Sequence, residues 1–309
     1  MARTRLVTPA APPRAPRPST PVLLVLGGIL SVQFGSALAQ TLVTVIGAGG
    51  AVVLRLAFAT AILLAVVRPR WRGHSRQAWL TVIAFGLALG LMNWAFYGSL
   101  AYLPIGVAVT IEFLGPLTLA AVLSRRLVDF LAVGGAAVGV VLISHALKTP
   151  WSQLPWTGLG LALVAGACWA AYVVLSGRTG QAFEKLDGLA LAMVVATIVT
   201  LPAGIMTVPQ WSGGILLKGV GIAILSSVLP YSLELLALRH LSAKVFGILL
   251  SLEPAVAALA GFLILGQVLD GSQLLGMALV VGASALVLGL GKQDRPPPEE
   301  LEVVAESGS

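Results

Sequence analysis

The chain has 309 residues, of which 58% are hydrophobic and only 10% are charged, and its mean hydropathy is +0.97. Globular domains carry about 25% charged residues, so this chain cannot cover a water-facing surface and is predicted to be a polytopic membrane protein. Its net charge of +7 does not indicate nucleic-acid binding, because the positive residues lie in short loops between apolar segments. One cysteine excludes an internal disulfide and a cysteine-based metal cage, and we expect neither a metal nor a cofactor.

Ten apolar segments follow one another along the chain, each about as long as a helix that crosses a bilayer core. They predict an all-α fold with ten transmembrane helices at 21–40, 47–67, 78–98, 103–123, 129–147, 156–176, 188–207, 216–238, 243–265 and 271–291. The first segment is too long for the apolar region of a signal peptide, so we expect it to remain as a helix. Residues 1–20, rich in Pro and Arg, and residues 292–309, polar and acidic, are predicted to be disordered tails.

The last five segments repeat the first five at an offset of 138 residues, which aligns Val107 with Val245 and the mid-segment prolines Pro116 and Pro254. An odd number of spans inverts the second repeat in the membrane, and inverted repeats are typical of carriers that expose one central site to alternate sides. The predicted domains are therefore a first repeat at 21–147, a connecting loop at 148–155 and a second repeat at 156–291, flanked by the two tails.

The distribution of Lys and Arg predicts the orientation in the membrane. If the N-terminus is cytoplasmic, sixteen of the nineteen Lys and Arg residues fall in cytoplasmic segments, and only Lys148 and Lys218 fall on the opposite side. Arg55 is the remaining one and lies inside a span. The positive-inside rule then places both termini in the cytoplasm.

Two glutamates lie near the middle of predicted spans, where an ionisable group costs about 2.5–3.5 kcal/mol on insertion scales. Glu112 precedes Pro116 by one helical turn, and the proline leaves the Glu112 carbonyl without its helical partner. Glu253 directly precedes Pro254 in the span that corresponds to that of Glu112. A carboxylate beside a broken turn suits a substrate or proton site; the alternative for each is a fixed salt bridge between helices.

Two further charged residues lie inside the spans. Arg55 is the only cation at mid-depth, and it either receives a substrate carboxylate bidentately or neutralises Glu112 or Glu253 as a fixed partner. Glu234 is expected toward the cytoplasmic end, close to Arg239, where a structural ion pair and a role in transport are both open.

Neutral polar residues at helical spacing accompany these charges. Asn93 and Tyr97 are four residues apart, whereas Trp169 and Tyr172, and Tyr231 and Glu234, are three apart, so each pair shares a helix face. Together they predict a partly polar cavity, although any one of them alone serves as a bridge between helices. The sequence has no P-loop, HExxH or GxSxG motif, so ATP is not the direct energy source and a membrane enzyme is disfavoured.

The motifs resemble those of the drug/metabolite transporter superfamily in its EamA-like branch. The resemblance rests on LRLAFATAILL in the second span and SLEPAVAALAG in the ninth. It is sharper to the bacterial threonine/homoserine exporter subgroup, through IEFLGPL, the SRR at 124–126, the GACWAAY at 166–172 and the PYSLELLAL at 230–238. One departure is Gly266-Gln267, where relatives often carry Gly-Glu; it concerns a loop near the outer mouth and not the central site.

The resemblance implies export of threonine- or homoserine-like amino acids, or related small metabolites, across the bacterial cytoplasmic membrane. We predict proton antiport, with the expected partners limited to a small-molecule substrate, protons and the lipid bilayer, and no nucleic acid. A zwitterion needs a cation and an anion, and the predicted substrate site is Arg55, Asn93, Tyr97, Glu112, Trp169, Tyr172, Tyr231 and Glu253. The candidate proton carriers are Glu112, Glu253 and Glu234. The rival interpretations are a carrier of a more apolar metabolite or drug with structural glutamates, a passive channel and a membrane enzyme.

Overall fold

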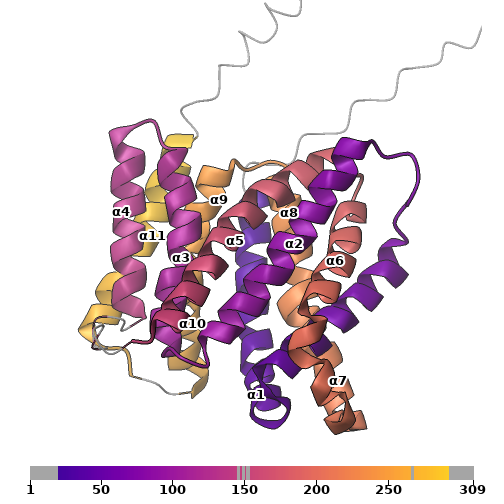
Figure 1. Ribbon diagram of the computed structural model, residues 1–309. Coiled ribbons are helices and arrows are strands. Elements are labelled where there is room, and N and C mark those ends of the chain that lie inside the picture. The colour runs from indigo at the N-terminus through magenta and orange to yellow at the C-terminus, as the bar shows by residue number, and fades with distance from the viewer. Residues whose placement is uncertain (1–19, 145–146, 148–149, 151–153, 266–267, 292–309) are drawn as a thin grey trace, which may run out of the picture.

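The computed structural model describes residues 20–291 except 145–146, 148–149, 151–153 and 266–267, so both predicted tails, most of the connecting loop and Gly266-Gln267 lie outside the described residues. Every regular element within the described ranges is a helix, which confirms the all-α fold class (Figure 1). The α-helices are α1 (Thr20–Val67), α2 (Arg76–Ser99), α3 (Ile105–Val122), α4 (Leu127–Ile143), α5 (Trp156–Ala182), α6 (Asp187–Gly204), α7 (Gly213–Ala223), α8 (Leu229–Leu238), α9 (Ala243–Leu250), α10 (Leu252–Leu265) and α11 (Gly271–Gly291). A 3₁₀ segment (Ile205–Gln210) precedes α7, and a π-helical segment (Ile224–Val228) joins α7 to α8.

Five described stretches are long and apolar enough to cross a membrane, which identifies a multi-pass membrane protein. They are Thr41–Val67, Arg76–Ser99, Trp156–Ala182, Gly213–Leu238 and Gly271–Leu288. Four shorter apolar helices accompany them, at Thr20–Ser36, Val107–Val122, Leu127–Ile143 and Asp187–Pro202. Side chains such as Leu23, Leu131 and Leu217 are more than half exposed, as expected for a surface that meets lipid and not water.

The first two predicted spans form one element, α1, because residues 41–46 are helical and not a connection. The helix changes direction only at Gly47, which has φ 71° and ψ 169°. This conformation is essentially restricted to glycine, because a Cβ atom would clash with the backbone. The sequence TLVTVI directly before Gly47 contains no turn-forming residue, so the helix continues as far as Gly47.

The ninth predicted span, 243–265, has the ends that the sequence predicts, but its helix is interrupted at Ser251. Helix α9 ends at Leu250 and α10 begins at Leu252, with Ser251 between them. Pro254 has no N–H to offer the carbonyl of Leu250, so the helical ladder is broken there. The Ser251 hydroxyl donates to the Ile248 carbonyl oxygen at 2.6 Å and stabilises the end of α9. The break places Glu253 in the first turn of α10.

Glycines allow several helices to meet at their backbones. A Cβ atom built on Gly115 of α3 would lie 1.9 Å from the Gly166 carbonyl oxygen of α5. On α4, a Cβ on Gly139 would lie 2.8 Å from the Gly276 oxygen of α11, whereas one on Gly135 would face open space.

The positively charged loops gather at one end of the bundle, the upper end in Figure 1. This end holds the connections 68–75, 123–126, 183–186 and 239–242, together with the first turn of α1 and the last turn of α11. The lower end holds the bend at Gly47, the connection 100–104 and the 3₁₀ segment. The loops of the upper end carry Arg68, Arg70, Arg72, Arg125, Arg126, Lys185 and Arg239.

Candidate functional site

Arg55, in the second arm of α1, is the centre of a buried polar cluster. The residue is only 8% exposed, and its Nη2 atom donates to the Asn93 Oδ1 atom of α2. The guanidinium carbon lies 5.7 Å from the centroid of the Tyr97 ring, and the Tyr231 hydroxyl of α8 also contacts the group. The Nε atom is buried without a hydrogen-bond partner among the described residues.

A fixed pair of Arg55 with Glu112 or Glu253, one of the two alternatives for this residue, is not among the contacts of the described residues. The neighbours of the guanidinium are an amide and two phenol rings, all of them neutral. A buried charge without a partner is costly, because several kcal/mol of hydration energy are lost. The cluster therefore fixes a cation inside the bundle and leaves it available to an anion.

Asn93 orients this cation. Its Oδ1 atom accepts from Arg55, and its Nδ2 atom donates to the Leu89 carbonyl oxygen at 2.9 Å and to the Tyr231 hydroxyl at 3.3 Å. Both amide hydrogens are thus engaged within the protein. Asn93 acts through Arg55, and the structure gives it no free donor for a ligand.

Glu234 is held on the other side of Tyr231. Its Oε2 atom accepts a 2.5 Å hydrogen bond from the Tyr172 hydroxyl of α5, and the Tyr172 ring lies 5.8 Å from the Tyr231 ring. The alternative of an ion pair between Glu234 and Arg239 is not among the described contacts, since Arg239 donates to the Phe183 carbonyl oxygen at 3.0 Å and to that of Lys185. Arg239 follows the last residue of α8, so its side chain reaches the loop after α5.

The other two intramembrane carboxylates, Glu112 and Glu253, interact with each other. Glu112 is 9% exposed on α3, and Glu253 is close enough to act electrostatically on it and also on Glu234. The Phe113 ring, next to Glu112, packs edge-on against the Trp169 ring with 4.7 Å between the centroids. The structure thus brings the three predicted glutamates into one region, and Trp169 borders it.

All eight predicted substrate-site residues lie inside the helix bundle, in two neighbouring groups. Arg55, Asn93, Tyr97, Tyr172 and Tyr231 are linked through direct contacts, and they reach Glu112, Trp169 and Glu253 through Glu234. None of them lines the groove of about 320 Å³ between α3 and α4, which is bordered by apolar side chains and Thr110.

The sequence analysis missed a set of buried hydroxyls. Ser176 and Thr179 of α5 are fully buried. The Ser176 hydroxyl lies beside the Tyr172 hydroxyl, and neither the Ser176 nor the Thr179 oxygen makes a well-aligned hydrogen bond among the described residues. Both share a helix face with Tyr172, because they follow it by four and seven residues. That spacing from Tyr172 was the signal available in the sequence.

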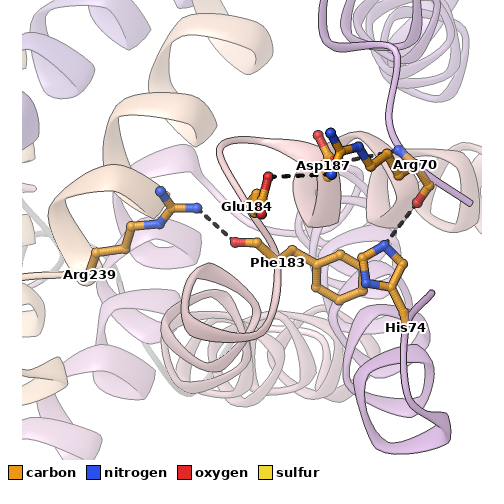
Figure 2. Close-up of polar contacts among 6 residues, drawn as sticks. All are labelled: Arg70, His74, Phe183, Glu184, Asp187 and Arg239. Atoms are coloured by element: carbon orange, nitrogen blue, oxygen red, sulfur yellow. Dashed lines mark hydrogen bonds and ion pairs between the residues drawn. The ribbon is translucent and has the colours of Figure 1, made fainter. Parts of the chain in front are cut away.

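The loop after α5 is held by residues from two other loops at the charge-rich end, as Figure 2 shows. The Arg70 backbone N–H donates to the Asp187 Oδ2 atom at 3.2 Å, and the His74 ring packs on the Phe183 ring at 4.3 Å. Arg239 donates to the Phe183 carbonyl from the opposite side. The Arg70–Glu184 pair is 3.8 Å long and more than three-quarters exposed, so it contributes little.

Fold and site together define a helical multi-pass membrane protein with one buried cation and three carboxylates inside the bundle. Such intramembrane charges mark the paths of substrates and ions. Residues 156–289 match the EamA-like transporter family. The chain is 40% identical over 267 residues to "Threonine/homoserine exporter RhtA" of Salmonella typhimurium strain LT2, covering 85% of this chain and 90% of that protein. It is 39% identical to the protein of that name from Escherichia coli K12, with the same coverage.

The chain therefore belongs to the EamA-like transporter family of the drug/metabolite transporter superfamily, among relatives of the RhtA type. "Protein PecM" of Dickeya dadantii is a more distant relative, 27% identical over 68% of this chain and 73% of that protein. A solved structure described as "Crystal structure of protein" matches with a TM-score of 0.70 and 18% identity, covering 90% of this chain and 99% of the other. That likeness supports the helical fold alone.

Proposed function

We propose that this protein is a secondary active transporter that exports threonine- or homoserine-like amino acids, or related small metabolites, across the bacterial inner membrane. The observation that carries the proposal is the buried Arg55, whose Nε atom has no described partner. Tyr231, which contacts Arg55, is also acted on electrostatically by Glu234, the first of the three buried carboxylates. A zwitterionic amino acid carries the charges that complement both groups. The relatives that are 39–40% identical are named as threonine/homoserine exporters, which agrees with this substrate class.

The proposed energy source is the proton gradient across the membrane, which the protein uses by proton antiport. Glu112 and Glu253 act on each other electrostatically in a buried region, where two carboxylates resist being ionised together. A proton bound between the two carboxylates removes their repulsion, and so does the positively charged ammonium group of a substrate. Binding of the substrate therefore favours release of the proton, which couples the two flows.

The proposed ten-helix architecture has two inverted repeats, 21–147 and 156–291, joined by 148–155. Contacts between residues 137 or 138 positions apart support it, because corresponding residues meet only at a two-fold axis. The Asn93–Tyr231 hydrogen bond has a separation of 138, the 2.8 Å contact between the Thr60 and Thr197 hydroxyls has 137, and Gly139 packs on Gly276. Arg55 touches both Asn93 and Tyr231, so the proposed site lies on this axis, as expected for alternating access.

An efflux assay with a panel of substrates tests the proposed function. Proteoliposomes containing the protein are expected to export threonine and homoserine against a gradient, and an uncoupler is expected to abolish the accumulation. Transport that prefers apolar compounds lacking a carboxylate would support the rival carrier instead. Flux that neither saturates nor responds to the uncoupler would indicate a passive channel.

The proposed orientation places both termini and the charge-rich end in the cytoplasm. In a Cys168→Ser background, a cysteine at Gln210, exposed at the lower end, is expected to react with an impermeant maleimide in intact cells. A cysteine at Glu184, whose side chain is 78% exposed at the upper end, is expected to react only after lysis. The reverse pattern would overturn the orientation, because each site serves as the control for the other.

A further inference from the structure

A row of unpaired polar atoms on α5 leads from the carboxylate cluster toward the charge-rich end. Tyr172, which donates to Glu234, begins the row, and Ser176 and Thr179 continue it on the same helix face. The row ends beside Arg239, because a Cβ atom on Gly180 would lie 3.1 Å from the Arg239 Cγ atom and 3.4 Å from its Nε atom. That Nε atom is also buried and without a partner among the described residues.

These atoms need hydrogen-bond partners that the described side chains do not supply. A buried hydroxyl left unpaired costs about 1–3 kcal/mol. Unpaired buried groups in native proteins are few, and water commonly satisfies them. Two hydroxyls of α5 and a guanidinium nitrogen at the end of α8 therefore indicate a row of water molecules between these two helices.

We propose that the Tyr172–Ser176–Thr179 row is a water-lined path along which protons pass between Glu234 and the charge-rich end, with Arg239 at its mouth. The path rests on the proposed proton-coupled export and adds a route to it. A proton leaves the Glu234 carboxyl for the first water of the file, and each hydroxyl accepts one hydrogen bond while it donates another. The loop at 183–186, which Arg239, Arg70 and His74 hold in place, closes the path from the water outside (Figure 2).

The groups that face Glu234 suit this exchange. Tyr172 from α5 donates to it, Tyr231 lies on its own helix, and Glu253 from α10 acts on it electrostatically. Gly28 of α1 also lies close by, since a Cβ atom added there would lie 3.8 Å from the Glu234 Cγ atom. No cation faces Glu234 directly among the described residues, so a proton is the charge that leaves or enters here.

The test removes the hydroxyls and keeps the shape of the side chains, in the variant Ser176→Ala/Thr179→Val. Substrate-driven proton flux in proteoliposomes is expected to fall about tenfold, which corresponds to the loss of one hydrogen bond of about 1.4 kcal/mol from the path. Substrate counterflow, which needs no net proton release, is expected to keep the wild-type KM. The melting temperature in detergent is expected to stay the same or rise, because removing an unpaired hydroxyl leaves nothing unsatisfied.

Two controls separate a proton path from a structural role. Ser284→Ala removes another buried, unpaired hydroxyl, on α11, which packs against α4, and is expected to change none of the three measurements. Thr179→Ser keeps the hydroxyl and is expected to retain the flux. A double variant with wild-type proton flux, or one that loses stability and counterflow together, would overturn the path. If the wild type moves no protons with its substrate, the proposed antiport itself fails, and the path fails with it.

Discussion

Arg55→Ala is expected to raise the half-saturating concentration of an amino acid by about thirtyfold or more, since removing one partner of a buried charge pair costs about 2–5 kcal/mol. The wild-type guanidinium is held by Asn93 and Tyr231 with its Nε atom unused, so it is pre-organised for a carboxylate. A decarboxylated amine of the same side chain is expected to bind the wild type poorly and to lose nothing in the variant. Binding assays with both compounds measure the difference.

Asn93→Asp provides a second variant that keeps the arginine. The new carboxylate would occupy the place of the Oδ1 atom that already accepts from Arg55, and would neutralise the cation inside the protein. Amino-acid binding is expected to fall as in Arg55→Ala, whereas the melting temperature is expected to be retained. Asn93→Ala is the matched control, because it removes the acceptor without adding a charge. Equal binding of an amino acid and its amine by the wild type would refute the carboxylate role.

Glu112→Gln and Glu253→Gln are expected to abolish substrate-driven proton flux in at least one case. A glutamine keeps the shape and a hydrogen-bonding oxygen, but it can neither release a proton nor repel its neighbour. Substrate counterflow is expected to persist in the affected variant, because alternation between the two sides requires no titration. Reconstituted vesicles with a trapped pH indicator and labelled substrate measure both flows.

Glu184→Gln is the control for these two variants, since its side chain is 78% exposed in a loop at the charge-rich end. It is expected to transport protons and substrate as the wild type does. Wild-type proton flux in both Glu112→Gln and Glu253→Gln would show that the coupling group lies elsewhere.

The sequence predicted the helical class and most of the helices, because long apolar segments have few alternatives to a helix in a membrane. It did not predict two features that depend on single residues. The bend of α1 falls at Gly47 and not in a connection before it, and the ninth span divides at Ser251. Hydropathy reports neither cause. The bend depends on the backbone conformation of Gly47, and the division of the ninth span depends on the missing N–H of Pro254.

The candidate site was predicted as a set of residues, but their pairing was not predictable. Helical spacing placed Asn93 beside Tyr97, yet the contact of Arg55 with Asn93 depends on how α1 crosses α2. The same limit applies to Glu234. The sequence suggested Arg239 as one possible partner because it lies near Glu234 along the chain, whereas the contact with Tyr172 of α5 depends on how the helices pack. Ser176 and Thr179 escaped notice because such hydroxyls commonly bond to their own helix.

The single-residue bend at Gly47 bears on how the chain enters the membrane during synthesis. Arg55 leaves the ribosome well before Asn93 and Tyr231, so it meets the lipid before its partners exist. An arginine at the centre of an isolated helix opposes insertion by about 2.5–3.5 kcal/mol. Because no polar loop separates the two arms of α1, residues 20–67 can enter as one helical hairpin. The favourable insertion of the apolar first arm then offsets part of the cost of inserting the arm that carries Arg55. The hairpin is in the bilayer before the helices that carry Asn93 and Tyr231 are inserted.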